Sequence, residues 1–295
     1  MRIGYPCINN SIDGTSNGTF RLKSYSQERL IEVVEKNLEA LMAIIQFNIE
    51  HDLLFFRIGS SIIPFASHPV CDLDWSKHFA RKLTNIGDFI KKHNIRISMH
   101  PDQFVVINSL SADIVQRSVA ELEYQCKFLN SLGLEADAKL QIHVGGMYGD
   151  KQASIARFIE NYKSLSENLK KRLVIENDDR LYSVQDCLYI HEATNIPIIF
   201  DNLHFDCLNN HENMLDAFKL TASTWKENDG IPMIDYSTQE PDARVGNHTK
   251  TIDEQHFANF LKLTKDFDFD IMLEIKDKEL SALKAREVMK SLNLL

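Results

Sequence analysis

Short apolar runs alternate along this chain with longer segments in which apolar residues recur every three or four positions. Runs of this length and composition are typical of buried strands, and the longer spacing predicts amphipathic helices. The predicted strands lie at residues 2–6, 53–59, 95–100, 139–143, 172–176, 196–201, 231–236 and 268–274. The predicted helices lie between them, at residues 26–51, 75–93, 112–132, 151–170, 183–193, 213–226, 252–265 and 278–291.

Apolar strands that alternate with amphipathic helices predict a parallel sheet whose outer face is covered by the helices. Eight such units favour closure into an α/β (β/α)8 TIM barrel. No GxGxxG or Walker loop follows the first strand, which argues against an open dinucleotide-binding sheet. No linker-like tract divides the chain, so we predict one domain over residues 1–295 with long loops at 7–25, 60–74, 101–111 and 236–251.

Polar residues of metal-binding types close the third to the eighth predicted strand, and two histidines lie nearby. In a barrel the carboxyl ends of the strands converge on one face, so these side chains should meet there. They exceed what one tetrahedral ion can bind, and their four carboxylates would repel one another without cations. The predicted ligands are His100, His143, Glu176, Asp201, His204, Asp235, His248 and Glu274.

The ligand types indicate the kind of cofactor. Imidazole and carboxylate groups without thiolates suit Mn²⁺, Zn²⁺ or Fe²⁺. We expect a cluster of two to three divalent ions, with Mn²⁺ as the first choice and Zn²⁺, Mg²⁺ or Fe²⁺ as alternatives. Ions about 3.5 to 4 Å apart suit displacement at phosphorus, because they can hold the attacking and the leaving oxygen. The expected catalytic members are His143, Glu176, Asp235 and Glu274.

Composition gives information about the partners, the location and the thiols of the protein. The formal net charge is −9, yet carboxylates that bind cations account for part of it, so the charge does not exclude nucleic acid as a partner. The sequence contains no apolar run of the roughly 20 residues that a membrane span needs and no signal-like start, which predicts a cytoplasmic protein. Five scattered cysteines without a CxxC pair predict reduced thiols.

Seven motifs carry a family resemblance: GYPCIN at 4–9, FRIGSSIIPFASHP at 56–69, SMHPDQF at 98–104, HVGGMYGDK at 143–151, IENDD at 175–179, FDNLHF at 200–205 and MLEIKDKE at 272–279. Together they resemble the UV damage endonucleases, which are TIM-barrel DNA repair enzymes akin to endonuclease IV. The resemblance implies a metal-dependent nick immediately 5′ to cyclobutane dimers, 6-4 photoproducts and, as a third class, abasic sites. The implied products are a 3′-hydroxyl and a 5′-phosphate.

The resemblance also implies roles for individual residues. All the predicted ligands except Asp235 match family metal ligands. Tyr5 and Asn9 match residues of the first strand and its loop and are expected to bind DNA or the lesion. Gln103 and Phe104 match a pair that enters the duplex at the lesion, although many relatives have Tyr where this chain has Phe. We expect contacts to DNA phosphates from four basic residues near the predicted top face, unless they are ordinary surface charges: Arg57, Lys151, Arg244 and Lys250.

The seventh strand departs from the family. Several members carry Lys-x-His-x-Ser there, whereas this chain has Met233, Asp235 and Ser237 at the corresponding positions. Met cannot replace a Lys that assists a metal site, but Asp235 can supply an oxygen ligand in place of the His. We therefore expect an altered metal preference or occupancy.

The expected partner is UV-damaged double-stranded DNA, bound by a monomer that associates with the nucleoid and requires no membrane or protein partner. Two other functions fit part of the pattern. A sugar isomerase or epimerase of the same barrel type would hold one or two ions in a small closed pocket, without a loop that enters DNA. A non-catalytic damage-binding protein would bind irradiated duplex and leave it uncut.

Overall fold

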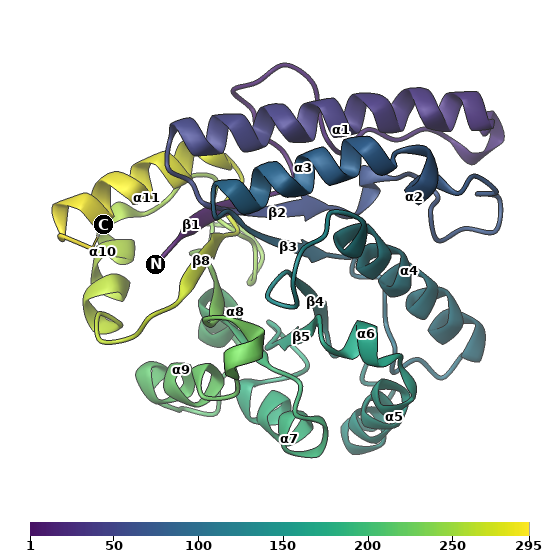
Figure 1. Ribbon diagram of the computed structural model, residues 1–295. Helices are drawn as coiled ribbons and strands as arrows, with labels where there is room; N and C mark the ends of the chain where they lie inside the picture. The colour runs from purple at the N-terminus through teal and green to yellow at the C-terminus, as the bar shows by residue number, and fades with distance from the viewer. Residues whose placement is uncertain (295) are drawn as a thin grey trace.

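The strands form a closed parallel barrel in the computed structural model, which describes residues 1–294 (Figure 1). Each strand pairs with the next in sequence, and the last pairs with the first. The predicted (β/α)8 barrel is therefore confirmed. The strands are β1 (Ile3–Pro6), β2 (Phe55–Gly59), β3 (Arg96–His100), β4 (Lys139–His143), β5 (Leu173–Glu176), β6 (Ile198–Asp201), β7 (Met233–Tyr236) and β8 (Asp270–Leu273).

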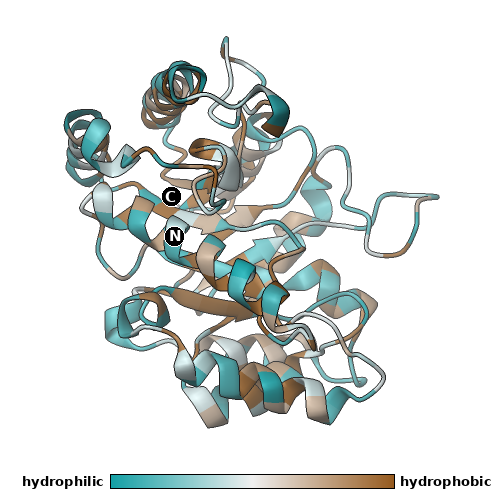
Figure 2. Cartoon of the chain, turned by 90° about the vertical axis from the view of Figure 1, so that its right-hand side faces the viewer, coloured by the Kyte–Doolittle hydropathy of each residue, from teal (hydrophilic) through white to brown (hydrophobic). Residues whose placement is uncertain are grey.

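Helices cover the outside of this barrel, and Figure 2 shows apolar strands in the interior with hydrophilic helix faces toward solvent. The helices are α1 (Gln27–Glu50), α2 (Trp75–His78), α3 (Ala80–Lys92), α4 (Ala112–Ser131), α5 (Lys151–Ser164), α6 (Glu167–Lys170), α7 (Val184–Thr194), α8 (Asn202–Cys207), α9 (Met214–Ala222), α10 (Glu254–Leu263) and α11 (Glu279–Ser291). Short 3-10 turns are η1 (Leu22–Ser24), η2 (Ser60–Ile62) and η3 (Glu227–Asp229).

Local side chains explain where these helices begin and end. The Ser26 side chain accepts a hydrogen bond from Arg29 N and starts α1. Gly133 follows the end of α4 with φ +66°, a left-handed conformation that glycine adopts readily after a helix. Two predicted helices are each divided in two, at Phe79 and before Ser166, whose hydroxyl caps α6. Apolar spacing continues across both breaks, so periodicity alone did not reveal them.

Side chains inside the barrel form layers, because alternate residues of each strand point inward. An apolar layer crosses the middle of the barrel and consists of Phe55, Val174, Ile199, Met233 and Met272. Toward the amino ends of the strands, Arg96 Nη1 donates to Asp270 Oδ2 over 2.9 Å. Toward the carboxyl ends lie the predicted metal ligands. The barrel interior therefore separates two polar layers by an apolar one.

Met233 belongs to this apolar layer and is 1% exposed. It lies two positions before Asp235 on the same face of β7, one layer below the predicted ligands. A charged side chain here would be surrounded by apolar groups on the side away from the site. Met233 thus forms part of the apolar layer directly below the predicted ligands.

No helix within residues 1–294 is both long enough and apolar enough to cross a membrane. In the same part of the chain, the five cysteines are free. This agrees with the prediction of reduced thiols.

Candidate metal centre

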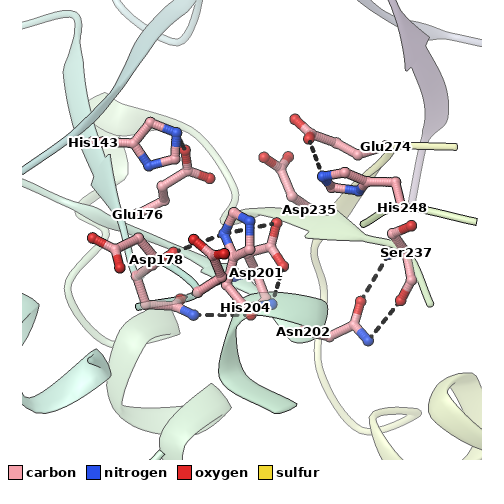
Figure 3. A network of polar contacts seen from close by, with 12 residues as sticks. His143, Glu176, Asp178, Asp201, Asn202, His204, Asp235, Ser237, His248 and Glu274 are labelled. Carbon is pink, nitrogen blue, oxygen red and sulfur yellow. Dashed lines mark hydrogen bonds and ion pairs between the residues drawn. The ribbon is translucent and has the colours of Figure 1, made fainter. Parts of the chain in front are cut away.

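The predicted ligands gather at the carboxyl ends of the strands, around a cleft of about 480 Å³ (Figure 3). Figure 3 shows His143 beside Glu176 and His248 beside Glu274, with Asp235 between these pairs. The cleft is lined by six of the eight predicted ligands: His100, His143, Glu176, His204, His248 and Glu274. The other two, Asp201 and Asp235, are fully buried below it.

Three overlapping groups within the described residues could each hold an ion, with their ligand atoms within 4.8 Å of one another. The groups are His100–His143–Glu176, Glu176–Asp201–His204 and Asp201–Asp235–Glu274. Glu176 is common to the first and second groups, and Asp201 to the second and third. A carboxylate has two oxygens and can bridge two ions, so this arrangement suits a cluster better than separate sites.

Unsatisfied buried oxygens show that the centre fits cations. Glu176 Oε1 and Asp201 Oδ2 are buried without a hydrogen bond among the described residues, although His143 Nε2 lies 3.0 Å from Glu176 Oε1. Leaving a charged oxygen unpaired in the interior is costly. Among the described residues, the imidazoles of His100, His143 and His204 lie close enough to offset that cost when they carry an extra proton. Divalent cations bound between these oxygens and the imidazoles would offset it without those protons.

The ligands of the second group are oriented by local structure. Asp201 Oδ1 accepts a hydrogen bond from His204 N over 2.8 Å and caps α8, which leaves Oδ2 for an ion. His204 Nδ1 lies 3.0 Å from Asn177 O, so donation from Nδ1 leaves Nε2 free to bind. Helix α8 begins directly after Asp201 and brings Asp201 and His204 onto one turn. Asn177 was not predicted as part of the site.

Gln141 is a second residue that the sequence analysis missed. Its Nε2 donates to Glu176 Oε2 over 2.6 Å and also to Asp235, while its Oε1 accepts from Arg57 Nη2 over 2.6 Å. Gln141 lies two positions before His143 on the inward face of β4. A lone amide inside an apolar strand, in register with a predicted ligand, was the available signal.

His248 is held by the loop between β7 and α10. Gln239 pairs with His248 in an antiparallel bridge, and its Oε1 accepts from Gly246 N over 2.8 Å. Gly246 has φ +86°, and a Cβ there would lie 2.5 Å from Asp179 Oδ2. The loop is thus closely packed on the segment after β5. It places His248 Nε2 3.6 Å from Glu274 Oε2.

Charge interactions within the cluster shift the pKa values of its members. Burial lowers the pKa of His204, but the carboxylates of Asp201, Glu176 and Glu274 outweigh it and raise that pKa to about 10. Burial raises the pKa of Asp201 to about 6, although His204 opposes this shift. Protons and metal ions therefore compete for the same ligand atoms.

This competition predicts that metal binding strengthens as pH rises. His204 holds its extra proton at any pH below about 10 and must lose it before Nε2 can bind an ion. We expect the Kd for Mn²⁺ to fall roughly tenfold per pH unit for each proton released between pH 6 and pH 8. Calorimetric titrations in two buffers of different ionisation enthalpy would count those protons. Equal Kd values at pH 6 and pH 8 would contradict the prediction.

Removal of divalent ions should destabilise the protein, because the carboxylates of the cluster then repel one another. At a Mn²⁺ concentration 100 times its Kd, binding contributes about 2.7 kcal/mol, which for a chain of 295 residues corresponds to a rise in Tm of roughly 4 °C. Differential scanning calorimetry with Mn²⁺ and with a chelator would measure it. Mg²⁺ at the same concentration provides a comparison. If neither Mn²⁺ nor Mg²⁺ changed Tm relative to the chelator sample, the result would count against a metal centre.

The residues predicted to contact DNA are divided between surface and interior. Gln103 lines the cleft, and Phe104 next to it lines an adjoining pocket and is 76% exposed. Arg244 also lines the cleft. Lys151 is partly exposed and pairs with Asp186 over 2.9 Å, and Lys250 pairs with Glu240 over 3.2 Å.

Tyr5, Asn9 and Arg57 do not lie where a direct contact to DNA would place them. Tyr5 is 0% exposed and donates to Asn48 Oδ1 over 2.6 Å, because its side of β1 faces α1. Asn9 is 5% exposed and donates to Tyr5. Arg57 points into the barrel, where it is 2% exposed. The predicted DNA contacts therefore do not fit the burial of these three side chains.

Asp235 was predicted as a metal ligand, and both of its oxygens already accept hydrogen bonds. Arg57 Nη2 donates to Oδ1 over 2.6 Å, and Gln141 donates to Oδ2. Burial raises the pKa of Asp235 well above its usual range, Arg57 lowers it, and the neighbouring carboxylates raise it again. An ion at Asp235 would have to compete with these contacts.

Comparison with known proteins gives a consistent result over the whole chain. The family described as UV-endonuclease UvdE matches residues 1–294. A UV DNA damage endonuclease from Clostridium perfringens (strain 13 / Type A) is 41% identical over 295 residues, which cover 99% of this chain and 72% of that protein. Another from Bacillus thuringiensis subsp. konkukian is 33% identical, with 92% of this chain and 86% of that protein covered.

Three solved structures resemble this chain, one in both sequence and fold and two in fold alone. The crystal structure of SacUVDE matches with a TM-score of 0.95 and 49% identity, over 100% of both chains. Endonuclease IV from Thermus thermophilus matches with a TM-score of 0.61 and 14% identity, over 87% of this chain and 96% of that one. A D-psicose 3-epimerase from Clostridium cellulolyticum has a TM-score of 0.55 and 13% identity, over 85% and 91% of the two chains. The last two matches concern the fold alone.

Proposed function

This chain belongs to the UV-endonuclease UvdE family and is a DNA repair endonuclease for UV damage, and from that premise we propose that it nicks the damaged strand immediately 5′ to a photoproduct. The proposed lesions are cyclobutane dimers, 6-4 photoproducts and abasic sites. The proposed products are a 3′-hydroxyl and a 5′-phosphate. The observation that carries the proposal is a cluster of shared carboxylates and imidazoles in a cleft beside the exposed Phe104.

The proposed mechanism assigns the ion-binding role to His248 and to the members of the three overlapping groups other than Asp235, whose two oxygens already accept hydrogen bonds. Divalent ions, with Mn²⁺ as the first choice, would supply a water of lowered pKa and neutralise the 3′-oxygen leaving group. Gln141 fixes the direction of the Glu176 carboxylate through its 2.6 Å hydrogen bond. Asn177 and the α8 cap fix His204 and Asp201. We propose that the reaction centre is preorganised by these neighbours.

Lesion recognition is proposed to rest on the loop after β3. Pro101 follows His100 directly, and in the same loop Gln103 lines the cleft while Phe104 lines the adjoining pocket. An exposed aromatic side chain can replace the stacking that is lost when bases leave the duplex, and damaged bases cost less to unstack. Arg180 and Arg244 line the cleft as well and are proposed to contact phosphates.

The test is incision of supercoiled plasmid with Mn²⁺, before and after UV irradiation. We expect relaxation of the irradiated plasmid alone, with a 3′ end that a DNA polymerase extends. A lesion placed in a labelled duplex then locates the nick. A damage-binding protein would retard that duplex without cutting it, and an epimerase would do neither; either result would refute the proposal. Gel filtration with and without duplex tests the proposed monomer.

Replacement of Phe104 by Ala should weaken damage-dependent nicking without destabilising the protein. The side chain is 76% exposed, so little packing is lost. Stacking of an aromatic side chain on a base is worth about 1 to 3 kcal/mol, which predicts a loss of about 5- to 150-fold in kcat/KM on irradiated DNA. The measurement is nicking of a duplex with one lesion. Leu110→Ala is the matched control, because Leu110 is 67% exposed in the same loop region.

A further inference from the structure

Arg57 occupies an unusual position for a charged side chain. It lies on β2, points into the barrel and is 2% exposed. Its Nη2 donates over 2.6 Å to Asp235 Oδ1 and over 2.6 Å to Gln141 Oε1, and its Nη1 donates to Glu274 Oε1. A guanidinium buried so completely is tolerated only where such partners compensate its charge.

The partners of Arg57 are also members of a candidate metal group. Asp235 and Glu274 make up two of the three residues in the group that includes Asp201. Asp235 offers one oxygen to Arg57 and the other to Gln141, so neither is free of a hydrogen bond. An ion and the guanidinium would therefore compete for the same oxygens. Below Asp235 lies the apolar layer that contains Met233, which supplies no further ligand.

Glu274 keeps one oxygen for the rest of the centre. Arg57 binds Oε1, whereas Oε2 faces His248 Nε2 at 3.6 Å. Arg57 and His248 lower the pKa of Glu274 to about 2 against the effect of burial. The free Oε2 can thus join the His204 side of the cluster while Arg57 holds its partner oxygen.

The total charge of the cluster also favours two ions over three. The buried cluster contains four carboxylates, those of Glu176, Asp201, Asp235 and Glu274, and Arg57 reduces their charge from −4 to −3. With neutral imidazoles, two divalent ions bring the total to +1, which suits a phosphodiester of charge −1. Three ions would bring it to +3. With Arg57 in place, two ions leave the centre closer to neutrality than three.

We propose that Arg57 is a built-in cation of this centre, which holds the position of a third ion and limits the site to two divalent ions. Asp235 is then the counter-ion of Arg57 and not a metal ligand, and Arg57 is a positioning residue for Glu274. The inference rests on the proposed metal-dependent function. It concerns the number of ions bound, however, and can be tested without DNA.

The first experiment counts ions in the wild-type protein. Native mass spectrometry during a Mn²⁺ titration, with electron paramagnetic resonance of the same samples, should show two ions per chain and a spin-coupled pair. A third ion bound with comparable affinity would overturn the inference. If two ions bind but irradiated plasmid stays intact, the proposed nuclease function fails while this inference stands.

Variants separate the role of Arg57 from a purely structural one. Arg57→Met should bind three ions, because Asp235 and Glu274 lose their cation, whereas Arg57→Lys should return the number to two. Asp235→Asn should leave two ions with a Kd within about threefold of wild type, because this residue is not a ligand in the scheme. Asp201→Asn is the positive control and should lose at least one ion.

Two outcomes would overturn the inference. One is an Arg57→Met protein that still binds two ions with wild-type affinity, which would show that the guanidinium does not exclude a third. The other is the loss of an ion in Asp235→Asn, which would make Asp235 a ligand. If Arg57→Met does not fold, the inference can still be tested by the ion count of the wild-type protein and of Asp235→Asn. Each of these two counts alone can contradict the inference.

Discussion

Replacement of Glu176 by Gln is expected to reduce damage-dependent nicking by about 10³-fold or more. Glu176 belongs to two of the three candidate ion-binding groups, and its Oε1 lies 3.0 Å from His143 Nε2 and 3.2 Å from His100 Nε2. A neutral amide cannot bridge two cations. The variant should therefore lose metal as well as activity, and both effects have the same cause.

The Glu176→Gln experiment needs measurements of metal content, activity and folding. The side chain keeps its size and Gln141 remains nearby, so far-UV circular dichroism should match the wild type. In the absence of metal the variant should be less stable at neutral pH, because burial is outweighed by His143 and His100, which hold the pKa of Glu176 well below its usual range, and a neutral amide loses this pairing. Glu167→Gln is a matched control: its side chain is 81% exposed on α6, and nicking should be unchanged. Nicking above a tenth of the wild-type rate would rule out the bridging role.

The largest effect on stability is expected for Arg57→Met. Removing one partner of a buried ion pair typically costs about 3 to 5 kcal/mol, because the other charge stays buried without compensation. In Arg57→Met, the buried carboxylates of Asp235 and Glu274 would both lose the cation that compensates their charge. Urea unfolding of the metal-free protein should show this loss as a lower midpoint. The double variant with Asp235→Asn should recover part of it, since one of the two uncompensated charges is then gone.

The loss in Arg57→Met should also depend on pH. Burial already raises the pKa of Asp235 above its usual range, and without Arg57 that pKa rises further. A carboxyl group whose pKa is raised by folding stabilises the protein relatively at low pH, and this contribution is lost as pH rises through the folded-state pKa. The destabilisation should therefore be larger at pH 8 than at pH 5. A pH-independent loss would indicate that packing and not charge is responsible.

The strands, and the gathering of the candidate ligands at one end of the barrel, could be predicted from the sequence for a common physical reason. Apolar runs of strand length are rarely interrupted, so a polar residue such as His143 or Glu176 at the end of a run is conspicuous. Barrel geometry then brings those ends together whatever the loops do. Helix α8 was not among the predicted helices, although Asp201 can cap a turn that contains His204.

The sequence was less informative about side chains within strands. Arg57 lies inside an apolar run, and its charge suggested a surface contact to phosphate, whereas its partners come from strands far away in sequence. Gln141 was overlooked for the same reason. Tyr5 shows the opposite case: its place on β1 was predicted correctly, but the chain alone did not indicate that it faces α1. Partners that are distant in sequence decide these roles.

The apolar layer across the barrel limits the route by which water reaches the cluster. Phe55, Val174, Ile199, Met233 and Met272 are each at most 1% exposed and separate the cluster from the amino ends of the strands. Water in the described part of the barrel therefore enters and leaves the cluster through its mouth, the same opening over which a docked duplex would lie. A docked duplex would enclose the water molecule that is consumed when the duplex is hydrolysed. The next water molecule would arrive after the nicked strand departs.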